Sequence, residues 1–257
     1  MQINITPIPA LSDNYIWAMH RTSQPYCLLV DPGEATPALA WLEQHRLEPV
    51  AILLTHHHYD HVNGVDELAT RFELNIYGPD DERMPKGTVA VAEGETVEIP
   101  GLELRFDVLE VPAHTRSHIA FYGHDLVFCG DTLFSAGCGR LFEGTPDQMQ
   151  AAMDKLAALP GDTKVYCGHE YTQSNCRFAL KVEPDNPALR TRAKQVDALR
   201  ARHQVTLPTT IAEECSFNPF MRTREAAVID AAARYDADAA QSPEAVLGAI
   251  RRWKDAG

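Results

Sequence analysis

Residues 55–61 read Thr-His-His-His-Tyr-Asp-His and come directly after the apolar run Ala-Ile-Leu-Leu. The apolar run predicts a buried strand, so the histidines begin where that strand ends. Alternate side chains of an extended chain share a face, which puts His56 and His58 side by side. Asp60 and His61 follow where the chain turns towards a helix, so we expect them to point at a neighbouring position. Four histidines and one aspartate within six positions predict a metal site.

Three further candidate ligands, His114, Asp131 and His169, stand directly after later apolar runs. Imidazole and carboxylate together suit zinc, iron or manganese, and no thiolate is needed. The candidates form two sets of three: His56, His58 and His114 for one ion, and Asp60, His61 and His169 for the other. We expect Asp131 to bridge the two ions, because a carboxylate has two oxygens and an imidazole cannot bridge in this way.

Short apolar runs bounded by turn residues predict strands in the first two thirds of the chain. These runs are residues 3–8, 15–19, 26–30, 51–54, 102–109, 119–122, 126–129 and 164–167. Helical spacing marks residues 36–45, 64–72, 146–159, 175–182, 187–203, 224–235 and 243–253. The pattern predicts a mixed α/β domain over residues 1–170 and a smaller helical domain over residues 171–257.

The charge of the chain is unevenly distributed. The net charge is −13, and residues 1–170 carry 10 Lys and Arg against 25 Asp and Glu. Residues 171–257 carry 13 against 11. An acidic protein of pI 5.2 repels the backbone of a nucleic acid, so we expect no nucleic-acid partner.

The sequence also bears on the compartment. Residues 1–10 lack the basic start and long apolar stretch of a signal peptide, and no apolar run approaches a membrane span. The six cysteines include no C-x-x-C pair, so we expect reduced thiols rather than a disulfide framework. We therefore expect a cytoplasmic protein with no membrane partner. For the oligomeric state, we expect a monomer.

The pattern His-x-His-x-Asp-His, with a later His, Asp and His, resembles the metallo-β-lactamase superfamily. Within it, four more segments resemble the hydroxyacylglutathione hydrolases, or glyoxalase II. They are Gly-Asp-Thr-Leu-Phe at 130–134, Gly-Cys-Gly-Arg at 137–140, Tyr-Cys-Gly-His-Glu-Tyr at 166–171 and Asn-Pro-Phe-Met-Arg at 218–222. The resemblance covers essentially the whole chain. It implies a four-layer αββα sandwich followed by a smaller all-helical C-terminal domain.

The resemblance implies a thioester hydrolase that cleaves S-D-lactoylglutathione, or a related S-2-hydroxyacylglutathione, to glutathione and D-lactate in methylglyoxal detoxification. Two divalent ions suit this reaction, because metal binding lowers the pKa of water from about 15.7 to roughly 7 and supplies a hydroxide that attacks the thioester carbonyl. The leaving thiol has a pKa of about 8.5, so it can leave as a thiolate without a strong general acid, and we assign none. We expect zinc, with iron and manganese as alternatives.

By the same resemblance, four positions match the family's glutathione contacts: Arg140, Tyr171, Arg251 and Lys254. Their cations and donors suit a ligand with two carboxylates. The positive charges of Arg251 and Lys254 could instead stabilise the C-terminal end of the last helix by interacting with the helix dipole. Phe142 stands where some family members carry a tyrosine, so one hydroxyl contact is missing. Asp31 either orients the histidine segment or is a turn residue.

Three other functions compete with the hydrolase. The closest is a glutathione persulfide dioxygenase, a mononuclear iron oxidoreductase of the same superfamily, against which the second ligand set and the C-terminal segment argue. A tRNA-processing nuclease would share the ligands but needs a basic surface, which residues 1–170 do not supply. A metal-storing module is the alternative outside enzymes.

Overall fold

The computed structural model describes residues 3–257, which form two compact units. The first unit comprises the described residues up to Glu110 together with Ser117–Gly130, and the second comprises Val111–Arg116 and Asp131–Gly257. The chain therefore passes from one unit to the other three times before residue 132. These two compact units divide the chain differently from the predicted boundary at residue 170. The predicted boundary therefore stays a prediction.

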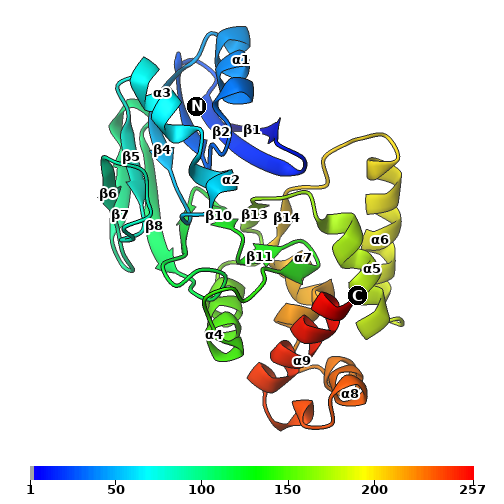
Figure 1. Cartoon of the computed structure of the whole chain (residues 1–257). Helices are drawn as coiled ribbons and strands as arrows, with labels where there is room; N and C mark the ends of the chain where they lie inside the picture. Colours follow the sequence, from blue (N-terminus) through cyan, green and yellow to red (C-terminus); the bar gives the residue numbers. More distant parts are fainter. Residues whose placement is uncertain (1–2) are drawn as a thin grey trace. The chain divides into compact units, whose positions relative to one another are not determined.

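The first unit is built on a six-stranded mixed sheet (Figure 1). Its strands follow the chain order: β1 (Ile3–Ala10), β2 (Asn14–Arg21), β3 (Tyr26–Val30), β4 (Glu48–Leu53), β5 (Asn75–Gly78) and β6 (Thr88–Ala90). The first three strands pair antiparallel and the last four parallel. Parallel neighbours need long crossovers, and helices α1 (Ala35–His45) and α3 (Val65–Arg71) lie in two of them.

The two crossover helices cover this sheet through one apolar core. Ala38 and Leu42 of α1 and Leu68 of α3 are fully or almost fully buried against strand residues that include Leu29 and Ile52. Burial of this kind stabilises by roughly 25 cal/mol per Å² of apolar surface. It fixes the carboxyl end of β4, where the histidine segment begins, against a rigid layer.

The first unit also holds four strands of a second sheet, each antiparallel to its neighbour. They are β7 (Thr96–Ile99), β8 (Leu104–Glu110), β9 (Ile119–Gly123) and β10 (Leu126–Gly130), with the short helix η1 (Pro100–Leu102) before β8. His124 and Asp125 join β9 to β10 in the left-handed region (φ 54° and 59°), which suits a two-residue hairpin turn.

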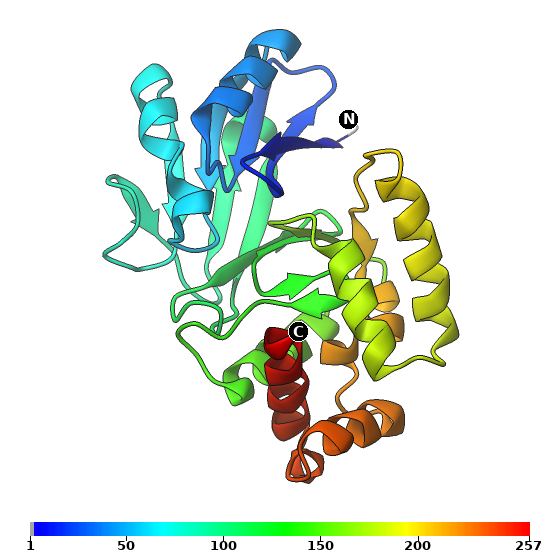
Figure 2. The same cartoon turned by 45° about the vertical axis from the view of Figure 1, so that its right-hand side comes forward.

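The second unit consists largely of helices (Figure 2). These are α4 (Pro146–Ala157), α5 (Thr172–Val182), α6 (Pro187–Arg200), α7 (Ile211–Phe217), α8 (Ala226–Tyr235) and α9 (Pro243–Ala256), with short helices η2 (Pro219–Met221) and η3 (Ala239–Gln241). Helix α4 begins with Pro146 after the capping box of Thr145 and Gln148, as a proline at its first turn predicts.

Short strands complete the second unit. Strands β11 (Leu133–Phe134) and β12 (Gly137–Cys138) form a short antiparallel hairpin. Strand β13 (Lys164–Cys167) pairs with β14 (Thr209–Thr210). Strand β14 lies in the part predicted to be entirely helical, and that detail is wrong. Two residues are too short to show a strand period, and Thr209 and Thr210 are extended because they pair with Lys164 and Val165.

Two expectations about the whole chain can be compared with the described residues. None of the helices between residues 3 and 257 has the length and apolar character to cross a membrane. All six cysteines are free thiols, and five of them are buried. Burial raises the pKa of Cys27 and of Cys176 to about 12, so these thiols stay protonated and unreactive.

Candidate active site

The histidine segment leaves β4 and brings His56 and His58 together as predicted. His56 is fully buried, and its Nε2 lies 3.2 Å from Nδ1 of His58. Two ligand atoms about 2.1 Å from a tetrahedral ion are separated by about 3.4 Å. The separation of these two nitrogens therefore fits two ligands of one ion.

Asp60 and His61 lie in the short helix α2 (Tyr59–Val62), one turn beyond the first pair. Nε2 of His61 is 3.5 Å from Oδ2 of Asp60, again the spacing of two ligands of one ion. The His61 ring lies 4.1 Å from the His56 ring, so the two pairs are neighbours. The amide of Asn14 donates to the same Oδ2 of Asp60 (2.9 Å) and restrains its carboxylate.

Asp31 orients the histidine segment, and it is also a turn residue, so both readings of it are confirmed. It follows β3 with φ 50°, in the left-handed region. Its carboxylate accepts hydrogen bonds from the backbone N–H (2.8 Å) and hydroxyl (2.7 Å) of Thr55, and its Oδ2 lies 3.0 Å from Nδ1 of His61. A carboxylate at Nδ1 holds the proton there, which leaves Nε2 of His61 as the ligand atom. Asp31 also lies close enough to His56 and His61 to form a candidate ligand group with them, but both of its oxygens accept hydrogen bonds, so we predict that it orients His61 instead of binding an ion.

A glycine is required where the segment after β3 passes the ligand helix. A Cβ added to Gly33 would lie 1.7 Å from the backbone oxygen of Asp60, far inside contact distance. The Pro32-Gly33 turn therefore lets the chain approach the first turn of α2 closely. This approach explains why glycine follows Asp31 and the proline.

The second unit brings together His114, Asp131 and His169. All three are buried, and Oδ2 of Asp131 lies 3.5 Å from Nε2 of His114 and 3.3 Å from Nε2 of His169. Nδ1 of His114 donates to the carbonyl oxygen of Arg140 (2.9 Å), so its Nε2 is presented as the ligand atom. Two imidazoles thus converge on one carboxylate oxygen.

Tyr171 adjoins this second group of donors. Its ring stacks on the His169 ring at 4.6 Å with only 6° between the planes, and Phe134 packs edge-on against it at 5.1 Å. The half-buried Tyr171 therefore contacts His169, one of the predicted metal ligands. This position next to the metal site is what a substrate contact requires.

The three predicted cationic contacts lie in the second unit around Asp255. Arg140 is exposed, with its Nε 3.4 Å from Oδ1 of Asp255. Arg251 is buried; it donates to the carbonyl oxygen of Cys138 (2.8 Å) and to Asp255 (3.0 Å). The ammonium of Lys254 is hydrogen-bonded to the side-chain oxygen of Asn175. Arg251 and Lys254 thus reach other elements, so capping of α9 does not explain these two side chains.

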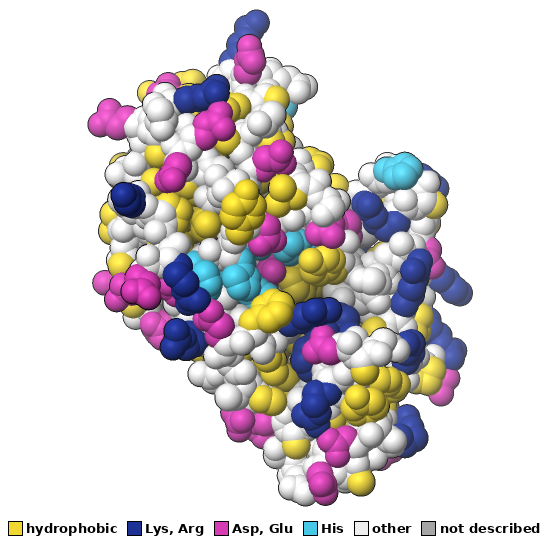
Figure 3. Space-filling view, viewed as in Figure 1, with side chains coloured by type: hydrophobic (Ala, Val, Ile, Leu, Met, Phe, Trp, Pro, Cys, Tyr) yellow, Lys and Arg dark blue, Asp and Glu magenta, His cyan; other side chains and the backbone are white. Residues whose placement is uncertain are grey.

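Two of these cations, Arg140 and Arg251, line a small groove of about 360 Å³. Its lining includes Arg140, Phe142, Arg251 and Asp255. On the surface visible in Figure 3, several Lys and Arg side chains lie where the C-terminal helices are exposed. Burial, and secondarily the charge of Arg251, lower the pKa of Lys254 to about 8. The lining of the groove itself carries three arginines, Arg140, Arg251 and Arg252, against Asp255, so the groove is positively charged at neutral pH.

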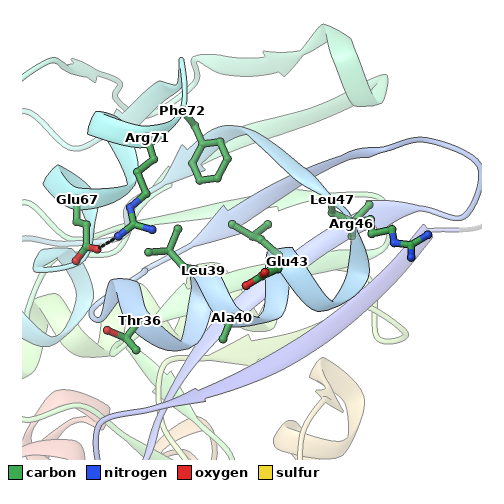
Figure 4. Close-up of a pocket in the computed structure, with 10 residues that line it drawn as sticks. Thr36, Leu39, Ala40, Glu43, Arg46, Leu47, Glu67, Arg71 and Phe72 are labelled. Atoms are coloured by element: carbon green, nitrogen blue, oxygen red, sulfur yellow. Dashed lines mark hydrogen bonds and ion pairs between the residues drawn. The ribbon is translucent and has the colours of Figure 1, made fainter.

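A second groove, on the first unit, contains none of the predicted site residues. It has a volume of about 600 Å³ and lies along α1 and α3, with Leu39, Leu47 and Phe72 in its lining (Figure 4). Arg71 at its edge is paired with Glu67 of the same helix at 2.7 Å. We therefore place the candidate site at the histidine, aspartate and cation groups.

Some contacts of the site were not foreseen. Asn14 has no motif around it, and only the fold brings it to Asp60. His57, which lies between the paired His56 and His58 in the chain, has its Nδ1 3.7 Å from Oδ2 of Asp81. A hydrogen bond from Ser117 and an ion pair with Arg83 hold Asp81 in turn.

Comparison with known families accounts for both parts of this arrangement. Residues 26–169 match the family model of the metallo-beta-lactamase superfamily. Residues 170–257 match that of the hydroxyacylglutathione hydrolase C-terminus. The chain belongs to the hydroxyacylglutathione hydrolases. The family predicted from the sequence is confirmed, and the two matches join between His169 and Glu170.

Relatives of the hydroxyacylglutathione hydrolase family agree over the full length. The hydroxyacylglutathione hydrolase of Aliivibrio salmonicida is 51% identical over 253 residues, covering 98% of each chain. Among solved structures, ETHE1 from Myxococcus xanthus superposes with a TM-score of 0.67 at 22% identity, covering 100% of each chain. TTHA1623, in a di-iron-bound form, has a TM-score of 0.61 at 26% identity, covering 84% of this chain and 99% of that one. The predicted fold class, with its helical C-terminal region, is confirmed.

Proposed function

We propose that this chain hydrolyses S-D-lactoylglutathione, or a related S-2-hydroxyacylglutathione, to glutathione and a 2-hydroxy acid such as D-lactate. This reaction is the second step of methylglyoxal detoxification. The observation that carries the proposal is the convergence of His114 and His169 on one oxygen of Asp131 within a member of this family. The relative from Aliivibrio salmonicida bears the name of the same hydrolase.

We propose two divalent ions as the cofactors, each held by three residues, with Asp131 shared. The proposed sets are His56, His58 and His114 for one ion, and Asp60, His61 and His169 for the other. Within each unit, neighbouring nitrogen and oxygen atoms of the candidate ligands lie 3.2 to 3.5 Å apart, and this spacing supports the assignments. Zinc is the first choice for nitrogen and oxygen donors, and iron or manganese would also fit. When bound, the ions supply a nucleophilic hydroxide and polarise the thioester carbonyl.

The residues of the chain itself would orient the donors and the substrate. The Asp31 carboxylate and the Arg140 carbonyl fix the protonation of His61 and His114, so both rings present Nε2. Arg140, Tyr171, Arg251 and Lys254 are proposed to bind the glutathione part. Glutathione carries two carboxylates, and charge-assisted hydrogen bonds to guanidinium and ammonium groups are the strong ones. No side chain is assigned as general acid, because a thiolate leaves readily.

Removal of the metal tests the proposed function directly. Dialysis against a chelator should abolish thioester hydrolysis, and added zinc should restore it as the metal content approaches two ions per chain. Elemental analysis and the absorbance of the thioester bond measure both quantities. Oxygen consumption with a glutathione persulfide, in place of thioester hydrolysis, would instead identify the dioxygenase. Hydrolysis that persists in metal-free protein would contradict the metal sites.

The pH dependence of substrate capture tests Lys254. Its pKa of about 8 means that the ammonium is mostly protonated at pH 7 and mostly neutral at pH 9. Because kcat/KM reports the free enzyme, it should fall about tenfold between these pH values if the charged form binds the carboxylate. Lys254→Arg keeps its charge throughout this range and should lack this step. The same fall in Lys254→Arg would show that another group titrates.

We propose a cytoplasmic, monomeric protein. The support for the compartment is the set of six free thiols, which a reducing environment maintains. Light scattering on the purified protein measures the mass directly, and a mass near 28.5 kDa is expected for the monomer.

A further inference from the structure

The hairpin β11–β12 connects the aspartate of the proposed metal site to the first cationic substrate contact. One residue, Thr132, separates Asp131 from the start of the hairpin, and one residue, Gly139, separates its end from Arg140. The hairpin itself is only two residue pairs long, Leu133 with Cys138 and Phe134 with Gly137. A two-stranded hairpin of this length is not stable in isolation, so its shape must come from its surroundings.

One buried amide holds both strands of this hairpin. Nδ2 of Asn218, a fully buried residue, donates to the carbonyl oxygens of Phe134 (3.1 Å) and Gly137 (3.0 Å). Phe134 and Gly137 are the last pair before the turn, so one side chain spans the two strands. Oδ1 of Asn218 accepts the N–H of Phe220 (3.0 Å), which fixes the amide to the start of η2.

A buried carboxylate fixes the orientation of that amide. Glu214 of α7 has no exposed surface, and its Oε2 accepts the N–H of Ala136 (2.9 Å) and lies 3.0 Å from Nδ2 of Asn218, whose two hydrogens are thus shared among three acceptors. Ala136 lies in the turn of the hairpin with φ 57°, so the same carboxylate also supports a left-handed residue. The hydroxyl of Thr209 donates to the other oxygen (2.7 Å). Because Oε2 accepts hydrogen bonds from both Ala136 and Asn218, it faces the N–H side of the Asn218 amide rather than its oxygen.

The far end of the hairpin reaches the proposed ligands through the backbone. The N–H of Gly139 donates to the carbonyl of Thr132 (3.0 Å), and a Cβ on Gly139 would lie 2.0 Å from the backbone oxygen of Asp131. The next carbonyl, that of Arg140, accepts Nδ1 of His114. A displaced hairpin would therefore move both Asp131 and the group that orients His114.

We propose that Asn218 is a positioning residue for the reaction, which sets the place of Asp131 and the orientation of His114 by clamping the two strands of the hairpin. This inference rests on the proposed function. It differs from a purely structural role because its effect is directed at the metal ligands. Asn218 touches neither the substrate nor the proposed ions.

Zinc titration against a chromophoric chelator, combined with steady-state hydrolysis, tests this role. Asn218→Ala removes the N–H donors that the carbonyls of Phe134 and Gly137 and the Glu214 carboxylate accept. Asn218→Asp keeps the shape of the side chain and the acceptor for the N–H of Phe220 but also removes both N–H donors. Both variants should bind zinc at least tenfold more weakly than wild type. At saturating zinc, their kcat should fall at least tenfold while KM changes less than threefold.

The matched control is Asn186→Ala, since Asn186 also donates to a distant backbone carbonyl, that of Ser216, and caps α6. It should lower the melting temperature without changing zinc affinity or kcat. If Asn218→Ala does not fold, Asn218→Ser keeps one hydroxyl donor and takes its place in the same titration. Wild-type zinc affinity and kcat in a folded Asn218 variant would overturn the positioning role. A wild-type protein that binds zinc but leaves the thioester intact would refute the proposed function instead.

Discussion

Replacing Asp131 with alanine is expected to lower kcat by on the order of 10³-fold or more. Oδ2 of Asp131 lies 3.3 Å from His169 and 3.5 Å from His114, two residues that the proposal assigns to different ions. A carboxylate between ligands of two ions is the group that would hold both ions at one separation and cancel part of their charge. Its loss should leave both ions weakly bound and wrongly spaced. Stopped-flow hydrolysis and elemental analysis on one preparation measure the two effects.

Two further variants make this result specific. Asp131→Asn keeps the size and one oxygen but removes the charge, so a loss nearly as large is expected. Asp162→Ala changes an exposed aspartate before β13 and should leave activity and metal content unchanged. Turnover within threefold of wild type in a fully metal-loaded Asp131→Ala protein would remove Asp131 from the shared position.

The first part of the site could be predicted because its geometry is local. His56 and His58 are two residues apart in an extended segment, and Asp60 and His61 follow in the next turn, so chain geometry alone pairs them. The ends of apolar strands also indicated the second group of candidate ligands, which the structure buries close together; their role as ligands stays a prediction. Their mutual arrangement around Asp131 is a matter of distances that the sequence does not contain.

The contacts that hold the site could not be predicted, because they join residues far apart in the chain. Asn218 and Phe134 are separated by 84 residues, and Arg251 and Cys138 by 113. No period or turn signal links such pairs. The guanidinium of Arg251 donates to the carbonyl of Cys138 and to Asp255, and its role as a substrate contact stays a prediction.

Short elements were missed for a related reason. Strands β5 (Asn75–Gly78), β6 (Thr88–Ala90) and β7 (Thr96–Ile99) have three or four residues, too few for alternation to stand out. Helix α7 (Ile211–Phe217) is only two turns long and carries the buried Glu214, which breaks the apolar pattern. Longer elements such as α1 and α6 agree with the predicted ranges to within a few residues.

Replacing Asp31 with asparagine should weaken metal binding by about 10- to 100-fold, and activity at limiting zinc should fall by a similar factor. The change is nearly isosteric, and one oxygen can still accept the N–H of Thr55. The new amide nitrogen is a donor, however, and cannot accept from the Thr55 hydroxyl or from Nδ1 of His61, which the carboxylate holds at 2.7 and 3.0 Å. The imidazole of His61 would then lose the partner that fixes its proton on Nδ1.

The comparison that isolates this effect is Asp66→Asn on the exposed surface of α3, which should match wild type. Competition for zinc with a chelator gives the affinities, and added zinc should restore much of the activity of Asp31→Asn, since the ligands themselves remain. For Asp31, rescue by zinc would separate an effect on the proton of His61 from the loss of a ligand, because removal of a ligand lowers kcat even when the metal is saturating. If Asp31→Asn binds zinc as wild type does, the bond to His61 does not control the metal, and the carboxylate serves only the turn after β3.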